Sequence, residues 1–331
     1  MSGSRERTPL LSRRSFVASL PLAVAGLRSR AWAAEPLTIW GPPATPSVIA
    51  AQAIASGALA SISPSVSFKT WKSPDEMRAG LSSGTMTAVI VPTYAAANLY
   101  NRGLAVHLVN VLTDGLLYVV APGGTVARVA DLKGRRVAVP FRNDMPDYIF
   151  RRMLADASLT ADDMTIDYSG TPIEAVQMLL AGRVDAALLS EPAASVAIVR
   201  ASLSLKTFER AIDCQTALAV STGRPVIPQA GLAVTDVFVR RYGEPAIAAV
   251  QSAFEQAVQA VTRDPSAAAS ATAAMLELPR PMIERSIPFS KLVARAASAA
   301  RSDLVALFDV LARQDPRIIG GRQPDDRFYA I

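Results

Sequence analysis

Cysteine and histidine are almost absent from this chain, which has one of each in 331 residues. Cys214 has no partner for an internal disulfide, and as a lone cysteine it is interpreted as a small buried apolar residue. A zinc site or a Cys–His nucleophile pair needs more of these side chains, so the sequence argues against both. His107 lies in the apolar run at residues 104–112 and is likewise interpreted as structural.

A long apolar run is also missing at the start of the chain. The apolar stretch at residues 16–27 has about 12 residues, whereas a helix that spans a bilayer needs about 20. It follows the twin arginines of Ser12-Arg13-Arg14-Ser15-Phe16-Val17 and precedes Ala31-Trp32-Ala33, a small-x-small cleavage site. Residues 1–33 are therefore interpreted as an export signal of the twin-arginine type that is cleaved after Ala33, with the general secretory route as the alternative, and the remainder as a periplasmic protein.

No strong charge remains once this segment is set aside. The whole chain carries a net charge of +6, but residues 1–33 hold six arginines against one glutamate, which leaves the other 298 residues near +1. These residues contain no basic stripe with interleaved aromatic side chains, so a nucleic-acid partner has no support. A chain of this length is long enough for two lobes of ordinary size.

What the sequence does contain is one supersecondary pattern that occurs twice. Ser73-Pro74-Asp75-Glu76 begins a helical pattern that leads into the apolar run at residues 88–91. Thr171-Pro172-Ile173-Glu174 begins the same pattern, which leads into residues 186–189 at a constant offset of 98. The repeat predicts two similar α/β lobes with a cleft between them.

Turn-forming residues predict where the chain passes from one lobe to the other. The first crossing is expected at the turn at residues 122–124 and the return near residues 223–228. Lobe 1 is thus expected to contain residues 34–121 and 228–331, and lobe 2 residues 122–227. Strands that alternate with helices predict mixed, mostly parallel sheets with helices on both faces.

The region after the return crossing has a different pattern. Residues 237–313 are expected to be helical, with Ala-rich faces and breaks at Pro265 and at Pro279-Arg280-Pro281. The tail after Pro316 contains Gly320-Gly321 and is expected to lie as an irregular strap over the surface.

Ligands of two-lobed α/β proteins bind beyond the carboxyl ends of the strands, where loops and helix N-termini converge. The loop Phe141-Arg142-Asn143-Asp144 is the most suggestive, because a helix start with free backbone N–H groups favours an anion and Arg142 could clamp it. The alternative is that Asn143 or Asp144 caps its own helix while Arg142 is solvated.

Other loop residues have two interpretations as well. The spacings of Ser73 with Glu76 and of Thr171 with Glu174 are typical of capping boxes, although the same helix ends could face the cleft. The carboxylates of Asp114, Asp144 and Glu191 could recognise an amine, which would suit a zwitterion. Large aromatic side chains could form an apolar wall or belong to the core. The predicted ligand-binding residues are Pro42, Pro43, Trp71, Ser73, Thr93, Tyr94, Asp114, Phe141, Arg142, Asn143, Asp144, Thr171 and Glu191. No catalytic residue, metal or cofactor is predicted.

Three segments carry a resemblance to a known family: DLKGRRVAVP at residues 131–140, EAVQMLLAGRVDAALLSEP at 174–192 and GLAVTDVF at 231–238. In these the chain resembles the nitrate, sulfonate and taurine group of ABC-transporter substrate-binding proteins, which also includes thiamine-precursor binders. The resemblance implies a two-lobed periplasmic-binding-protein fold of type II. Such a protein closes on a small molecule like a hinged trap and presents it to an inner-membrane permease with a cytoplasmic ATPase.

The expected function is therefore that of a monomeric periplasmic protein that captures a small anionic or zwitterionic organic solute, similar to a sulfonate, nitrate, taurine or a thiamine precursor, for an ABC importer. Sulfonate binders of the family have a small-residue loop where this chain has Phe141-Arg142-Asn143-Asp144, so sulfonate itself is not carried over. Two alternatives remain. One is an enzyme on the same fold, a lyase resembling chorismate dehydratase that uses Asp144 or Glu191 as a base. The other is a sensor module that docks onto a membrane receptor.

Overall fold

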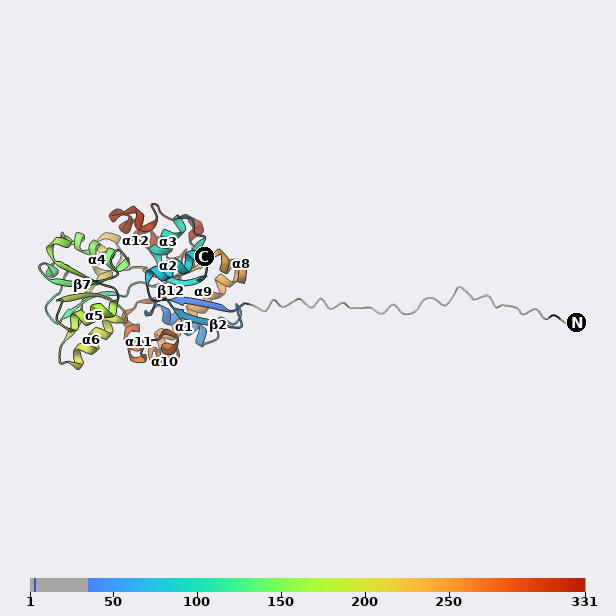
Figure 1. Cartoon of the computed structure of the whole chain (residues 1–331), viewed down its shortest axis with the longest axis horizontal. Coiled ribbons are helices and arrows are strands. Elements are labelled where there is room, and N and C mark those ends of the chain that lie inside the picture. The colour runs from blue at the N-terminus through green and yellow to red at the C-terminus, as the bar shows by residue number, and fades with distance from the viewer. Residues whose placement is uncertain (1–2, 4–34, 331) are drawn as a thin grey trace. The chain divides into compact units, whose positions relative to one another are not determined.

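Gly3 and residues 35–330 are described by the structure, a computed structural model, and residues 35–330 fold around two β-sheets (Figure 1). The expected export signal and its cleavage site lie outside the described residues, apart from Gly3. Residues 35–330 lie within one compact unit. The two α/β lobes that the internal repeat predicts are confirmed, with one sheet in each.

The first sheet has seven strands in the order β12-β5-β11-β3-β1-β2, with β4 paired to β11. β1 pairs in parallel with β2 and β3, and the other pairs are antiparallel. The strands are β1 (Leu37–Gly41), β2 (Val66–Thr70), β3 (Ala88–Pro92), β4 (Val106–Leu108), β5 (Asn110–Thr113), β11 (Ala230–Thr235) and β12 (Leu292–Ala296).

The second sheet has five strands in the order β10-β6-β9-β7-β8. β7 is parallel to β8 and β9, whereas β6 is antiparallel to β9 and β10. The strands β7 to β9 thus repeat the order and directions of β1 to β3, as the constant offset in the sequence predicts. The strands are β6 (Leu117–Pro122), β7 (Arg136–Pro140), β8 (Thr165–Ser169), β9 (Ala186–Ser190) and β10 (Phe208–Asp213).

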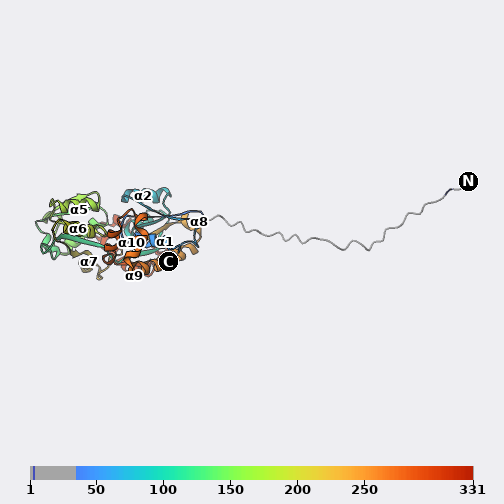
Figure 2. The same ribbon diagram turned by 90° about the horizontal axis from the view of Figure 1, so that it is seen from below.

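Helices cover both faces of each sheet, as α2 and α9 do for the first sheet and α5 and α7 for the second (Figure 2). The described helices are α1 (Ser47–Ala55), α2 (Pro74–Ser83), α3 (Thr93–Asn101), α4 (Met145–Asp156), α5 (Pro172–Leu180), α6 (Ala193–Leu203), α7 (Cys214–Thr222), α8 (Asp236–Tyr242), α9 (Pro245–Arg263), α10 (Pro265–Leu276), α11 (Arg280–Ser286) and α12 (Arg301–Gln314).

The strand residues alternate between two apolar cores, because successive side chains of a strand point to opposite faces of a sheet. Val137 and Val139 of β7 join the core under α4 and α7, while Ala138 joins the core under α5 and α6. Strands that are buried on both faces read as continuous apolar runs, which is why the apolar run at residues 186–189 predicts β9.

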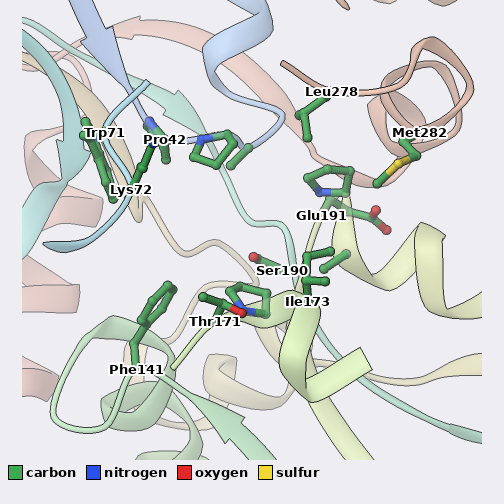
Figure 3. A pocket seen from close by; sticks show the side chains of 15 residues that line it. Pro42, Trp71, Lys72, Phe141, Thr171, Ile173, Ser190, Glu191, Leu278 and Met282 are labelled. Atoms are coloured by element: carbon green, nitrogen blue, oxygen red, sulfur yellow. The ribbon is translucent and has the colours of Figure 1, made fainter. Parts of the chain in front are cut away.

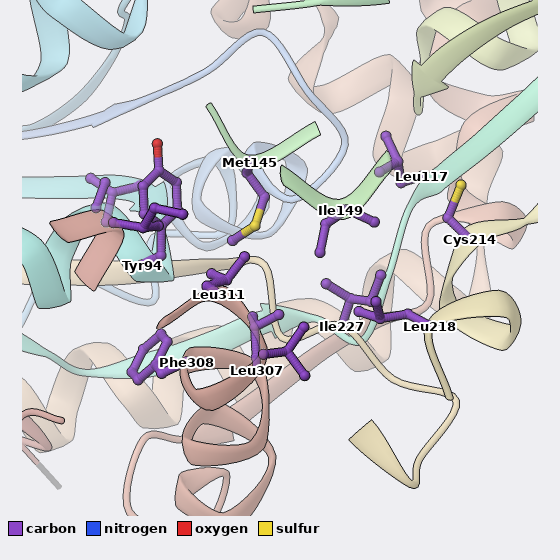
Figure 4. Packing of buried hydrophobic residues seen from close by; sticks show 14 of the residues in the cluster. Tyr94, Leu117, Met145, Ile149, Cys214, Leu218, Ile227, Leu307, Phe308 and Leu311 are labelled. Carbon is purple, nitrogen blue, oxygen red and sulfur yellow. The ribbon is translucent and has the colours of Figure 1, made fainter. Parts of the chain in front are cut away.

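One core extends across both sheets, and α12 completes it (Figure 4). Leu307 and Leu311 of α12 lie in the same buried cluster as Ile149 of α4. Phe308 meets Phe328 of the C-terminal tail, with ring centroids 6.4 Å apart. The two lobes therefore share a packed apolar face on the side of α12.

Some expectations for the chain path are wrong. The turn at residues 122–124 predicts a crossing after β6, but β6 pairs with β9 and β10, so the chain enters the second sheet after Thr113. β12 lies in the region expected to be helical. The tail, expected to be an irregular strap over the surface, contains two short 3-10 turns, η4 (Pro316–Ile319) and η5 (Asp326–Phe328), and buries Phe328.

Candidate functional site

A cavity of about 360 Å³ lies where loops of the first sheet face helix starts of the second sheet (Figure 3). The loop after β1 and the residues after β2 contribute from the first sheet. The end of β7 and the N-termini of α5 and α6 contribute from the second, and α11 closes one side. The lining residues are Pro42, Pro43, Ala44, Trp71, Lys72, Phe141, Thr171, Pro172, Ile173, Ser190, Glu191, Pro192, Ala193, Leu278 and Met282.

Most of this lining is apolar. Trp71 is buried, and its indole Nε1–H donates to the carbonyl of Ile90 at 3.0 Å, so the polar atom of the ring is already satisfied. Phe141 lies on the same side of the cavity as Trp71, and Leu278 and Met282 lie across from them (Figure 3). A flat or branched apolar group fits between such walls, and a cavity of a few hundred Å³ is ordinary for small-molecule sites.

Phe141 is held in an unusual backbone conformation. Its φ is 56°, in the left-handed region that costs a bulky residue about 1–2 kcal/mol. The backbone is fixed there because the Phe141 N–H donates to the carbonyl of Ser169 at 3.0 Å and its carbonyl accepts from the N–H of Asp144 at 3.0 Å. The strained turn places an aromatic ring at the cavity. Residues with strained backbones are often found at ligand sites.

Backbone donors are scarce around the cavity. Four lining residues are prolines, which have no N–H: Pro42, Pro43, Pro172 and Pro192. The first turn of α5 caps itself, because the Thr171 hydroxyl accepts from the N–H of Glu174 at 3.2 Å and the Glu174 carboxylate accepts from the N–H of Gly170 at 2.7 Å. Ser73 and Glu76 cap α2 in the same way. The side-chain caps of Ser73 and Thr171 are confirmed, but each glutamate accepts from the N–H of the residue before the cap, so the complete capping boxes do not form. These bonds use donors that a ligand would otherwise find.

Glu191 is one of the lining residues, but its carboxylate is paired with an arginine of the protein. The carboxylate is buried and accepts from Arg210 Nε at 2.8 Å and Arg210 Nη2 at 2.5 Å. The guanidinium also lies 3.5 Å from the ring centroid of Phe289. Burial raises the pKa of Glu191, and the attraction of Arg210 opposes this shift. The carboxylate is therefore committed to Arg210, and Lys72 is the one cation among the described lining residues.

Asp144 and Tyr94 join the two lobes beside the cavity. The Tyr94 hydroxyl on α3 donates to the Asp144 carboxylate at 2.7 Å, and Arg78 Nη2 on α2 donates to it at 2.8 Å. The same carboxylate caps α4 through the N–H of Met145 at 2.7 Å. Burial, together with the nearby negative charge of Asp144, holds the pKa of Tyr94 well above its usual value. Asp144 is thus saturated by groups of the protein itself.

The rest of the predicted anion-binding loop faces elsewhere. Arg142 is exposed and stacks over the ring of Tyr168, 5.0 Å from its centroid. Asn143 is exposed, and its N–H donates to the carboxylate of Asp147 at 2.8 Å. The alternative interpretation, in which this loop caps its own helix, describes the observed hydrogen bonds.

The structure brings together six of the predicted residues around the cavity: Pro42, Pro43, Trp71, Phe141, Thr171 and Glu191. Seven others do not line it: Ser73, Thr93, Tyr94, Asp114, Arg142, Asn143 and Asp144. Thr93 is buried and donates to the carbonyl of Pro228 at 2.7 Å, and Asp114 pairs with Arg295 at 2.5 Å.

Sequence reasoning missed the wall that α11 and the residues before it provide. Leu278 and Met282 flank the Pro279-Arg280-Pro281 break, which was the one signal in that region that the chain turns back toward the cleft. Within residues 35–330 no helix is long and apolar enough to cross a membrane. The same residues contain no group of three or more His, Cys, Asp or Glu side chains placed to hold a metal ion.

Comparisons with known proteins agree with this architecture. The structure described as an ABC transporter from Parabacteroides distasonis is similar with a TM-score of 0.72 and 24% identity, covering 88% of this chain and 98% of that one. The periplasmic aliphatic sulphonate binding protein SsuA from Escherichia coli has a TM-score of 0.70 and 18% identity, covering 89% and 91%. The periplasmic nitrate-binding protein NrtA from Synechocystis PCC 6803 has a TM-score of 0.58 and 16% identity, covering 76% and 69%.

These three likenesses establish the fold, because their identities are low. No curated protein matches the sequence. The family is established by a sequence model described as ABC transporter, phosphonate, periplasmic substrate-binding protein, which matches residues 61–236 and so more than half of the chain. With its two lobes, its cavity between them and this match, the chain belongs to that family of periplasmic substrate-binding proteins of ABC transporters.

Proposed function

We propose that this protein captures a small organic anion with an apolar body in the cavity and delivers it to an ABC permease that works with a cytoplasmic ATPase. In this proposal the chain acts as a monomer after export by the twin-arginine signal and cleavage after Ala33. The observation that carries the proposal is the apolar cavity of about 360 Å³, whose described lining includes one residue with a cationic side chain, the exposed Lys72.

The apolar walls account for most of the expected affinity. Burial of roughly 200 Å² of apolar ligand surface contributes about 5 kcal/mol at about 25 cal/mol per Å². A micromolar ligand needs about 8 kcal/mol in total. The remainder, about 3 kcal/mol, is within the range of a few hydrogen bonds from Thr171, Ser190 and Lys72, of which Lys72 is exposed and therefore screened.

The charges around the site favour an anion over a zwitterion. The three carboxylates that could bind an amine are each paired with an arginine: Glu191 with Arg210, Asp144 with Arg78, and Asp114 with Arg295. An ammonium group in the cavity would find no free carboxylate among the described lining residues. Taurine-like solutes are therefore disfavoured, and nitrate would leave the apolar walls uncovered.

No observation favours the alternative functions. A lyase needs a base that reaches its substrate, but Glu191 is held by Arg210 and Asp144 does not line the cavity. We therefore propose a binding function without catalysis.

Native mass spectrometry of residues 34–331, purified from the periplasm, tests capture directly, and a bound small molecule released on mild unfolding is expected. A thermal-shift series then compares alkyl and aryl carboxylates and sulfonates with amines of the same carbon skeleton. We expect the anions to raise the melting temperature and the amines to leave it unchanged. Stabilisation by the amines alone would refute the proposed charge.

Two variants locate the site. Lys72→Met is expected to weaken binding of the best anion about two- to fivefold, because an exposed charge is screened by solvent, while Lys69→Met, which removes a cation that lies over Trp40 outside the cavity, leaves it unchanged. Ile173→Trp places a larger side chain at the partly exposed wall of the cavity and is expected to abolish binding without loss of thermal stability. Unchanged affinity in both Lys72→Met and Ile173→Trp would place the ligand elsewhere.

A further inference from the structure

Two leucines at the C-terminal end of α6 face solvent almost completely. Leu203 is 81% exposed and Leu205 is 99% exposed, the two largest values among the exposed large apolar side chains of the described residues. Single exposed apolar residues are ordinary, but two in one turn form the start of a contiguous apolar surface.

Leu205 is also strained. Its φ is 57°, a left-handed conformation that favours glycine or asparagine and costs a leucine about 1–2 kcal/mol. The side chain buries nothing in return, because almost its whole surface is in solvent. The leucine at this position therefore contributes little packing to the fold, and its side chain is available for a contact outside the chain.

A groove of about 260 Å³ lies next to this turn, between α6 and α11. Its lining is Ser195, Val196, Val199, Arg200, Leu203, Pro281, Met282 and Arg285. Both arginines are exposed, and neither forms an ion pair within residues 35–330, whose ion pairs use other side chains. The groove thus combines an apolar floor with two free positive charges.

We propose that this α6–α11 surface, defined by Arg200, Leu203, Leu205, Pro281 and Arg285, is where the permease docks, through a segment that carries an apolar side chain and acidic residues. The two arginines supply the complementary charge for the acidic residues. A groove accommodates an inserted side chain of a protein, whereas a lipid surface would require only the protruding leucines. The inference rests on the proposed function, because it needs a permease.

The position of the surface links docking to the bound solute. α6 packs against the second sheet, and α11 packs into the core beside the first sheet. A partner seated in the groove therefore touches both lobes. Met282 lines the groove and the ligand cavity, and the N-terminus of α6 lines the cavity. A segment seated in the groove therefore contacts the same two helices that hold the solute.

The test measures binding of the mature chain to the permease–ATPase complex of this importer in nanodiscs of phosphatidylethanolamine and phosphatidylglycerol, with empty nanodiscs of the same lipids beside it. Leu205→Asn suits the left-handed turn and is expected to keep or raise the melting temperature. The variant Leu203→Gln/Leu205→Asn is expected to weaken binding to the complex at least tenfold, as is Arg200→Glu/Arg285→Glu. Val220→Gln is the matched control, because it removes an exposed apolar side chain (76% exposed) from α7, outside the proposed surface. This variant is expected to bind like the wild type.

Each outcome decides the matter. Unchanged binding of both double variants, or an equal loss in Val220→Gln, would overturn the docking surface. Binding of the wild type to empty nanodiscs that the leucine variant loses would assign the surface to the membrane and overturn a protein partner. If the wild type does not bind the complex but still releases a solute in native mass spectrometry, docking fails while solute capture stands. If neither is seen, the proposed function fails as well.

Discussion

The hydroxyl of Tyr94 should hold the two lobes together, and its removal should open them. Tyr94→Phe deletes the donor that reaches from α3 to the Asp144 carboxylate at 2.7 Å and leaves the buried ring in place. When the lobes separate, this bond is exchanged for one with water. We therefore expect the variant to shift the population toward the open form without loss of the fold.

The size of the shift follows from the local contacts. A hydrogen bond to a charged group contributes about 1.5–3 kcal/mol. After the substitution the Asp144 carboxylate still accepts hydrogen bonds from Arg78 and from the N–H of Met145. Its charge therefore remains hydrogen-bonded, and we expect the lower end of this energy range. A loss of about 1.5 kcal/mol changes the ratio of closed to open molecules about tenfold, and the apparent Kd rises by up to the same factor if binding needs the closed form.

Electron–electron distance measurements between spin labels at Val220→Cys on α7 and Ser270→Cys on α10 report this ratio without any ligand. The native Cys214 is buried and does not take the label. Tyr148→Phe is the control, because its ring packs edge-on against Tyr94 at 5.7 Å. A distance distribution for Tyr94→Phe that matches the wild type would refute the reasoning, as would an equal opening in Tyr148→Phe.

Two further predictions concern stability. Arg210→Met leaves the Glu191 carboxylate buried without a cation, so we expect a loss of about 3–5 kcal/mol. Burial already raises the pKa of Glu191 above its ordinary 4.5. The folded variant therefore keeps the proton where the unfolded chain releases it, and its stability should fall as the pH rises from 4.5. Melting temperatures from pH 4.5 to 8 check this, and Glu191→Gln/Arg210→Met should remove the dependence; a flat profile in Arg210→Met would contradict it. Gly115→Ala should lower the melting temperature strongly, because φ at this residue is 141° and the new Cβ would lie 1.9 Å from Cγ of Gln215. Gly124→Ala is the control, because φ is 72° there but the space around it is open, so we expect it to cost only about 1–2 kcal/mol. Equal losses of stability in the two variants would argue against the clash.

The elements that the sequence located well are those whose signals are local. The capping pairs at Ser73 and Thr171 lie within four residues, and the buried strands of each repeat are continuous apolar runs. The sequence pattern does not predict β12, because it is an edge strand whose residues are all only partly buried and which therefore lacks a continuous apolar run. The first crossing was misplaced because an apolar strand such as β6 looks the same in either sheet.

The candidate site was less predictable, since its polar groups are paired with distant parts of the chain. Nothing near Asp114 in the sequence indicates that Arg295 neutralises it, and the same holds for Asp144 with Arg78. The loops at the cavity follow from the repeat and the strand ends. Ion pairs between residues that are far apart in the sequence decide which carboxylates remain unpaired and able to bind a solute. A pattern along the chain does not contain that information.

The core that α12 completes limits how such proteins can be recombined. α12 begins at Arg301, long after β11 has returned the chain to the first sheet, yet its Leu307 and Leu311 fill the space beside α4 and α7 of the second sheet. A chimera that exchanged the second lobe as one continuous block of sequence would set foreign helices against the native α12 and lose their fit. The unit of exchange in this architecture is therefore discontinuous, and a grafted lobe would need to carry its own copy of the helix from the far end of the chain.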